Sequence, residues 1–393
     1  MLSSFKLGIL TLINNALKGE QNLLPEDFDY SKFYDFAVRQ QIIPLVYYGG
    51  YKLPGFTEKD IEGKIRSGAI YAAMVSEKQI LEINKICQAF DVKGIDYLKL
   101  KGTNLKALYP RTDMRIMGDA DILIRTSQMK DIEPVMISLG YTQKICGEYE
   151  WVWNNGVLKI ELHKSIISTH VQDFYAYFGD GWKFARKKEG NTREHIMSLE
   201  DEFIFLFTHF ARHYRYAGIG IKHATDIHVF LKAHDGLDLE YVYSGLEKLG
   251  LLKFYQNVRR MLDVWFDGAE GDEVSAFLTE KIFENGAYGT KNAGLRSEAV
   301  IFSKGTDAKG AKRKKFWRLV FPEYKDICPA YPWLNGRPLL LPFAWIYRII
   351  ITLLFRRDKI TSHKKNIEAI NKAEIDAYQA ELNFVGLDFN YEV

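Results

Sequence analysis

The chain of 393 residues has an ordinary globular composition, with 47% hydrophobic and 26% charged residues. This composition excludes a disordered tail, a collagen-like repeat and a low-complexity scaffold, and the length allows two or three units with a substantial core. The formal net charge is only +3, so no global field indicates a nucleic-acid binder. The 3 cysteines lie far apart without CxxC spacing, which favours a reducing, cytoplasmic location over a disulfide scaffold or a zinc knuckle.

Hydrophobic periodicity predicts helices at both ends of the chain and a small sheet between them. Residues 1–92 repeat their apolar positions at helical spacing, starting with an amphipathic N-terminal helix, and Gly94 ends this region. Short alternating runs then predict strands over 95–100, 119–124, 148–153 and 157–163. The Asn155-Gly156 pair suits a tight turn, so we expect the last two strands to form an antiparallel hairpin.

Helices are expected between and after these strands, over 103–109, over 127–139 and from an N-cap at Ser198 onward. Residues 286–311 are rich in Gly, Ser, Thr and Lys and are interpreted as a long flexible loop. The predicted division is an N-terminal helical region (1–92), an α/β core (93–190) and a C-terminal helical region (191–393). The fold class is therefore α+β, a small mixed β-sheet with flanking helices.

The most membrane-like segment is 338–355, which is shorter than the about 20 apolar residues of a spanning helix and carries Arg348 in its middle. We therefore expect no transmembrane span. A buried helix is favoured, and the alternative is peripheral contact with a membrane through Trp345 and Tyr347. The basic run 312–315 precedes two aromatic residues, but in so neutral a chain a solvated helix start is favoured over a nucleic-acid surface.

Two carboxylates, Asp119 and Asp121, stand two apart on a predicted strand, so both side chains project from one face. They repel unless positive charge lies between them, and a hard divalent cation, above all Mg²⁺, is the usual partner. Glu161, on a later strand, can join the pair, and three carboxylates can hold two metal ions for phosphoryl or nucleotidyl transfer. Alternatively, Lys159 and His163 on the same strand face neutralise Glu161 in a purely structural role.

A phosphate-binding turn is predicted just upstream. Gly102 and Thr103 lie between a predicted strand and a predicted helix, where backbone N–H groups and the helix dipole favour a triphosphate. Lys101, Arg111 and Arg115 supply positive charge nearby, and Arg115 is the preferred phosphate contact.

The order of these features resembles the polymerase-β-like nucleotidyltransferase superfamily, in which a small Gly-[Gly/Ser] turn precedes a DxD or DxE pair and a third carboxylate on a later strand. More narrowly, LKG with LYP, then R-x-MGD-x-D-[IL]-L and ELH, is similar to a bacterial family of uncharacterised nucleotidyltransferases. A helix with paired His, the segments GIGIKHATDIHVFL and GAYG, and YPWLNGRPLLLPFAW add to the likeness. The resemblance covers most of the chain and is most specific over 98–163.

The resemblance implies an enzyme that uses Mg²⁺, with two ions, to transfer a nucleoside monophosphate from an NTP to an acceptor hydroxyl. Asp119 and Asp121 would be metal ligands, and Glu161 the third ligand, which activates the acceptor. The nucleotide-binding residues that it implies are Lys101, Gly102, Thr103, Arg115 and Gly118. Thr103 replaces the usual Ser of the turn and keeps its hydroxyl.

Further residues are expected to support these groups or to contact the acceptor: His163, His209, His213, Lys222 and Asp226. His209 and His213 have the i, i+4 spacing of a zinc site, but no Glu follows the first His as in HExxH, so packing is favoured over zinc. The weak net charge favours a small-molecule or protein acceptor over nucleic acid. The alternative function is a non-catalytic Mg-NTP-binding sensor or interaction module on the same fold.

Overall fold

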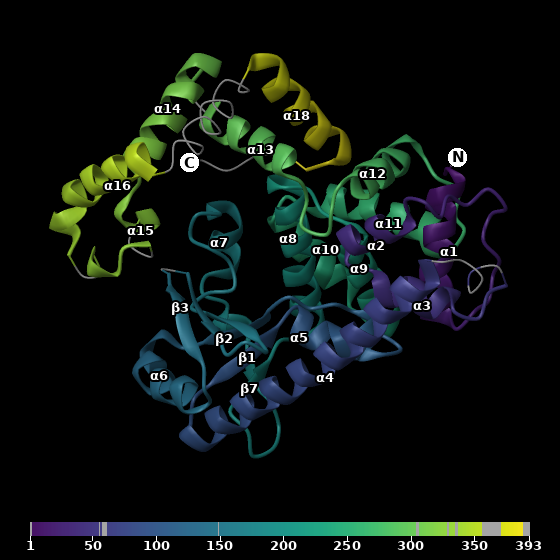
Figure 1. The fold of residues 1–393 in the computed structure, drawn as a ribbon, viewed down its shortest axis with the longest axis horizontal. Coiled ribbons are helices and arrows are strands. Elements are labelled where there is room, and N and C mark those ends of the chain that lie inside the picture. The colour runs from purple at the N-terminus through teal and green to yellow at the C-terminus, as the bar shows by residue number, and fades with distance from the viewer. Residues whose placement is uncertain are drawn as a thin grey trace.

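The computed structural model describes residues 2–54, 56, 61–147, 149–303, 306–327, 330–334, 337–355 and 371–387. Its centre is a mixed seven-stranded sheet with the strand order β3-β4-β5-β2-β1-β7-β6. In Figure 1 the long helix α4 (Ile61–Lys93) runs along the lower side of this sheet, while α8 (Leu199–Tyr216) and its neighbours gather above it. The predicted α+β fold class, a small mixed sheet with flanking helices, is confirmed.

Strands β1, β2, β4 and β5 lie close to their predicted positions, whereas β3, β6 and β7 were not predicted from the sequence. The strand bounds are β1 (Tyr97–Leu100), β2 (Ala120–Ile124), β3 (Thr142–Cys146), β4 (Glu150–Asn154), β5 (Lys159–His163), β6 (Arg186–Lys187) and β7 (Glu194–Ile196). Strand β2 is antiparallel to β1 and parallel to β5, and β4 pairs with β5 as the predicted antiparallel hairpin. Gly156 in the hairpin turn has a φ of 85°, a conformation that glycine adopts without steric cost.

Alternation along β2 and β5 separates two chemically different faces. Ala120, Ile122 and Ile124 pack with Ile160 and Leu162 of β5 against α4 and α6 (Met129–Ser138). The intervening residues therefore project toward α8. Pro134 is accommodated inside α6, and the helix predicted after β1 is α5 (Gly102–Leu105) with a following 3₁₀ turn.

The N-terminal helices pack against the C-terminal ones. They are α1 (Ser4–Lys18), α2 (Phe33–Gln40) and α3 (Ile43–Gly50), which precede α4. The side-chain amide of Asn14 in α1 donates to the carbonyl of Trp265 at 2.9 Å, so the two ends of the chain share one core. The division into three regions stays a prediction.

After the sheet the described chain is mainly helical. The bounds are α7 (Gln172–Phe178), α9 (Ile221–Ala233), α10 (Leu239–Lys248), α11 (Leu252–Phe266), α12 (Glu273–Glu284), α13 (Lys291–Ser303), α14 (Ala308–Val320), α15 (Tyr324–Ile327), α16 (Leu341–Phe355) and α18 (Lys372–Val385). Helix α8 begins at the predicted N-cap, where the Ser198 hydroxyl accepts from the backbone N–H of Asp201 at 3.1 Å.

Two expectations about this half are wrong. Residues 286–311 are not one long loop, because they contain α13 and the start of α14. Ala299 and Val300 of α13 are buried in the main core, and Asp307 caps α14 by accepting from the N–H of Gly310, so tertiary packing and a cap outweigh the loop-like composition.

The segment 338–355 is also not a buried helix, since only 6% of it is buried. It is long and apolar enough to cross a membrane by length and composition alone, which is weak evidence of a span.

The close crossing of α1 and α3 yields a first prediction. A Cβ on Gly49 would lie 1.8 Å from the backbone oxygen of Leu12, an atom that cannot move without shifting α1. Gly49→Ala should lower the free energy of unfolding by about 1–3 kcal/mol, measured by denaturant titration. Gly63→Ala in α4, where no atom lies within 4 Å, is the matched control and should be neutral or slightly stabilising. Equal stability of the two variants would contradict this account of the crossing.

Candidate active site

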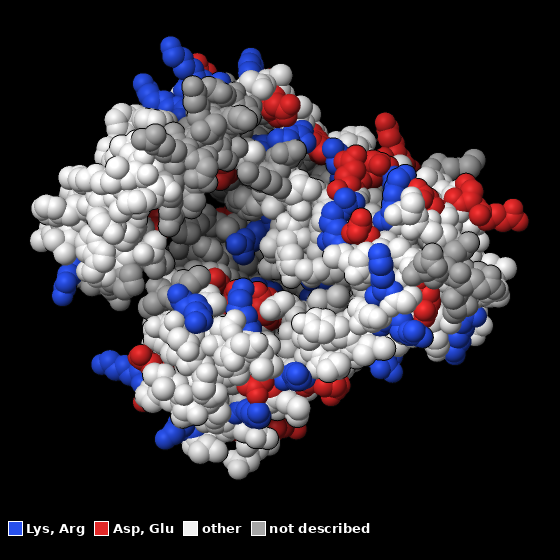
Figure 2. Space-filling view, viewed as in Figure 1, with Lys and Arg blue, Asp and Glu red and all other residues white. Residues whose placement is uncertain are grey.

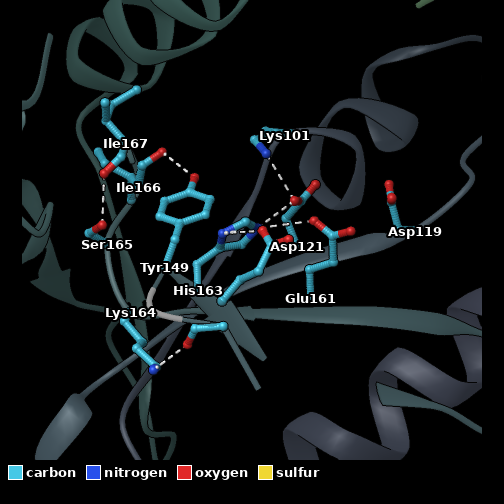
Figure 3. A network of polar contacts seen from close by, with 12 residues as sticks. Lys101, Asp119, Asp121, Tyr149, Glu161, His163, Lys164, Ser165, Ile166 and Ile167 are labelled. Atoms are coloured by element: carbon cyan, nitrogen blue, oxygen red, sulfur yellow. Dashed lines mark hydrogen bonds and ion pairs between the residues drawn. The ribbon is translucent and has the colours of Figure 1, made fainter. Parts of the chain in front are cut away.

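The acidic residues meet because β2 and β5 run parallel in register. Asp121 stands opposite Glu161, so the two carboxylates lie side by side on the face that points toward α8. Asp119 precedes the strand by one residue, and in Figure 3 its carboxylate stands to one side of the other two. Glu150 of β4 stands opposite His163 and adds a fourth acid that the sequence analysis did not identify. Pairing of the strands thus concentrates negative charge on one patch of the sheet.

Asp121 is buried and is held ionised by two partners. Its carboxylate accepts from the Lys101 ammonium at 2.9 Å and lies 2.7 Å from Nε2 of His163 (Figure 3). Burial alone would raise the pKa of Asp121, but the Lys101 charge and the His163 hydrogen bond hold that pKa well below its usual range. Both partners therefore favour the ionised form of the carboxylate.

Lys159 joins the other two acids. Its ammonium lies 2.8 Å from the Asp119 carboxylate and 2.7 Å from that of Glu161. His163 also contacts Glu161, at 3.7 Å. Lys159 and His163 thus make the contacts expected if they neutralise Glu161 in a purely structural role. Burial nevertheless raises the pKa of Glu161, the hydrogen bond from Lys159 lowers it, and the surrounding carboxylates raise it again, so that the net shift is upward. A carboxyl group with a raised pKa is a better proton acceptor than an ordinary one.

The donor set fits a hard divalent cation. One ligand atom each from Asp121, Glu161 and His163 lies within 4.8 Å of the others, with Asp119 beyond this group. Carboxylate oxygens are the ligands that Mg²⁺ prefers. The two lysines that contact the acids provide the positive charge that such a cluster requires. Lys159 is 39% exposed, so its side chain can withdraw into solvent when another cation approaches.

Helices form the opposite wall of a cleft of about 270 Å³. Figure 2 shows a hollow on this face of the molecule, with basic and acidic side chains on its rim. The lining residues are Lys101, Gly102, Leu105, Arg115, Met117, Gly118, Asp119, Asp121, Tyr149, Glu150, Glu161, His163, Leu206, His209, Arg212, His213, His223, Asp226 and Tyr288. The sheet contributes the acids, whereas α8 contributes Arg212 and two histidines.

The histidines of the helical wall are held neutral. Nε2 of His209 lies 3.0 Å from Nε2 of His213, and the His213 ring stacks on that of His223. Burial and then the nearby Arg212 charge lower the pKa of His213 to about 3, and burial with neighbouring cations lowers the pKa of the other two. Among the described residues, the group that could hold a metal ion is that of Asp121, Glu161 and His163, and the expectation against zinc at His209 and His213 stays a prediction.

Arg115 is fixed by a buried ion pair. Its guanidinium donates to both oxygens of Asp226 at 2.9 Å each, and the Tyr109 hydroxyl of the LYP motif donates to the same carboxylate at 2.8 Å. Gly102 is required beside this pair because a Cβ there would lie 2.4 Å from Arg115 Nη1. Arg115, the preferred phosphate contact, thus reaches the cleft with its charge balanced, and Asp226 acts as its anchor.

The remaining predicted residues lie at the margin. Thr103 does not line the cleft, and its hydroxyl is buried without a hydrogen-bond partner. Lys222 lies behind Tyr288, donating to its hydroxyl at 3.1 Å and to the Gln41 side chain at 2.6 Å, and burial lowers the Lys222 pKa to about 7. Gly118 lines the cleft, where a Cβ would come within 3.7 Å of the Tyr288 hydroxyl.

Several lining residues were missed by the sequence analysis: Tyr149, Glu150, Arg212, His223 and Tyr288. Two of them carried a usable signal. Arg212 falls between the paired histidines and must share their helix face approximately, and Tyr288 is the aromatic residue of GAYG. The other three become neighbours of the acids only through the pairing of β4 with β5 and the packing of α9.

Acids on adjacent strands of a small mixed sheet, covered by a helical wall, are the arrangement of a nucleotidyltransferase core. Comparison with known families agrees: the model of a family described as uncharacterised nucleotidyltransferases matches residues 26–267, more than half of the chain. The chain belongs to this family, which makes it a transferase, as the sequence resemblance implied.

The other comparisons add little. No protein of curated function matches the chain. A solved structure with some likeness is that of the antibiotic-resistance factor ANT(2'')-Ia, at 15% identity and a TM-score of 0.33, covering 48% of this chain and 97% of that chain. This likeness is too weak to inform the site.

The neutral histidines predict a pH dependence of stability. Unfolded His213 takes up a proton near its ordinary pKa of 6.5, whereas folded His213 does so only near 3. Between these values the unfolded state binds more protons, so the free energy of unfolding falls as the pH falls, by at most about 1.4 kcal/mol per pH unit for one histidine. His213→Gln should flatten this slope in denaturant titrations at pH 4.5 to 6.5 (roughly the window in which unfolded His213 is protonated). The exposed His170, replaced in the same way, is the control, and an unchanged slope in His213→Gln would refute the assignment.

Proposed function

We propose that this protein transfers a nucleoside monophosphate from a Mg²⁺-bound NTP to a hydroxyl of an acceptor. The observation that carries the proposal is the opposition of charge across one cleft: Asp121 and Glu161 lie on the sheet, and Arg212 of α8 lies on the facing wall. Lys101 adds positive charge from the sheet side, where it pairs with Asp121. A metal–triphosphate complex needs both, since its cation binds carboxylates while its phosphate oxygens bind guanidinium and ammonium groups.

Each side chain then has a definite task. Asp119, Asp121 and Glu161 would hold the metal, one ion or two, which when bound neutralises phosphate charge and favours the ionised acceptor. Glu161, whose pKa is raised, takes the proton of the acceptor hydroxyl. The acceptor oxygen forms a bond to the α-phosphorus, the bond from that phosphorus to the oxygen of the β-phosphate breaks, and pyrophosphate leaves.

Arg212 is the best candidate for the triphosphate. It lines the cleft, and within the described ranges no carboxylate pairs with it, whereas the charge of Arg115 is balanced by Asp226. Lys101 forms an ion pair with Asp121 and lines the same cleft as Arg212. We therefore assign phosphate binding to Arg212 first, with Lys101 and Arg115 shaping the field around it.

The neutral imidazoles of α8 and α9 suit the acceptor. They offer hydrogen-bond donors and acceptors without charge, in a cleft of about 270 Å³, which favours a small hydroxylated molecule or a single protein side chain over a nucleic-acid strand. The NTP base and the acceptor are left for experiment.

The first test is pyrophosphate release with each NTP, Mg²⁺ and a pool of small molecules from a cell extract. The wild type should release pyrophosphate, and Asp119→Asn with Asp121→Asn should abolish both release and metal-dependent nucleotide binding. Glu161→Gln should keep Mg-NTP binding but lower kcat by about 10² or more, because the proton acceptor is lost. Nucleotide binding without release in the wild type would instead support the sensor alternative, and full binding by the double variant would refute the site.

A second test separates phosphate binding from the chemistry. Arg212→Gln should raise KM for the NTP about tenfold or more and leave Mn²⁺ binding to the acids unchanged. Arg260→Gln, at an exposed arginine of α11 paired with Asp272, is the matched control and should behave as the wild type. An unchanged KM in Arg212→Gln would transfer the phosphate contact back to Arg115 or Lys101.

A further inference from the structure

Helix α16 presents an apolar surface to the outside of the molecule. Phe343, Ile346 and Ile350 follow each other at i, i+3 and i+7, so they form one outward stripe, and they are 65%, 57% and 49% exposed. Leu339 precedes the stripe and Leu354 continues it, again largely exposed. The whole segment Pro338–Phe355 has a mean hydropathy of 1.9. Monomeric proteins in water rarely expose so continuous an apolar patch without a partner for it.

The inner side of α16 is firmly attached to the preceding helices. The Trp345 indole donates to the carbonyl of Pro322 at 2.9 Å, and the Arg348 guanidinium donates to the carbonyl of Leu319 at 2.5 Å. Ala344 is buried with Ile327 and other apolar residues of a small separate cluster. These contacts fix α16 in the fold. Because they all use its inner side, the outer stripe is left exposed to solvent.

Aromatic rings border the stripe. Trp317 and Phe321 of the α14 end stack at 5.3 Å between ring centroids, and Phe321 meets Trp345 edge-on at 5.2 Å. On the other side Tyr347 meets Tyr331 at 5.9 Å. Trp and Tyr with one apolar and one polar side are enriched where hydrocarbon meets water.

Basic charge lies beside this surface. Helix α14 contains Lys309, Lys312, Arg313, Lys314, Lys315 and Arg318 and no acidic residue. Lys315 pairs with Glu298 and Arg318 with Asp326, and the side chains of Arg313 and Lys314 are exposed. In Figure 2 the face over α14 to α16 is a broad uncharged expanse with Lys and Arg at its upper edge.

We propose that this surface, the outer stripe of α16 with the basic side of α14, docks on an anionic lipid bilayer. The apolar stripe enters the boundary between headgroups and acyl chains, the aromatic rings lie at headgroup level, and the lysines and arginines contact lipid phosphates. This is independent of the proposed transfer reaction.

The contacts favour lying on the membrane over crossing it. A spanning α16 would carry Arg348 and the attached end of α14 into the hydrocarbon, where charges are costly. They also favour lipid over a second copy of the chain. Pairing two α16 stripes about a twofold axis would bring two basic α14 helices close together, and no acidic residue of α14 would offset the repulsion between them.

The test is flotation of the full chain with vesicles of phosphatidylcholine alone or mixed with phosphatidylglycerol. The protein should float with the anionic vesicles, remain largely unbound with the neutral ones, and be released by high salt. Ile346→Asp with Ile350→Asp should reduce the bound fraction at least tenfold, and Arg313→Glu with Lys314→Glu should do so on anionic vesicles.

Ile70→Asp with Leu81→Asp, at similarly exposed positions of α4, is the matched control and should bind as the wild type. Unchanged thermal unfolding in all variants establishes that they fold. The proposal is overturned if the wild type does not float with anionic vesicles, if the α16 variant floats equally well, or if the wild type is a dimer that the α16 variant converts to a monomer while neither binds vesicles.

Discussion

Electrostatic repulsion between carboxylates on neighbouring strands is the constraint on which the site depends. Register places Asp121 beside Glu161, and the fold separates them from water on a face that is covered by helices. Such a cluster is stable only with positive charge among the acids. Lys101 and Lys159 provide it here, from the end of β1 and the start of β5, so that compensation and repulsion arise from adjacent strands of one sheet.

The backbone conformation at Lys101 helps to position its ammonium group beside the acids. Lys101, at the end of β1, has a φ of 47°, one of only two positive values among the described non-glycine residues. Side chains other than glycine reach this region at a cost, so the surrounding contacts must hold it there. The ion pair of Arg115 with Asp226 has a comparable role between elements, because it joins the loop before β2 to α9 and thereby sets the distance between the acidic and helical walls.

Local pattern was sufficient to predict β1, β2, β4 and β5 and the strand face that the acids share, but not β3, β6 and β7. Asp119, Asp121 and Glu161 could be predicted because alternation along a strand determines which side chains share a face. Arg212 and Tyr288 could not be placed in the same way, since their distance to the acids depends on how α8 and the segment after α12 pack. The composition of 286–311 suggested a loop because the segment is rich in Gly, Ser, Thr and Lys, whereas the burial of Ala299 and Val300 depends on packing against distant helices. The exposure of α16 could not be read from hydropathy, which is equal for a buried and an open apolar helix.

Tyr288 shows that the cleft depends on more of the chain than the sheet and the helices next to it. Among the described residues that line the cleft, it is the only one outside the matched range 26–267, and it stands over Gly118 with Lys222 behind it. It is carried by the segment between α12 and α13, far along the chain from the strands that carry the acids. A substitution in this segment would therefore change the lining of the cleft without altering the strand pairing that brings the carboxylates together.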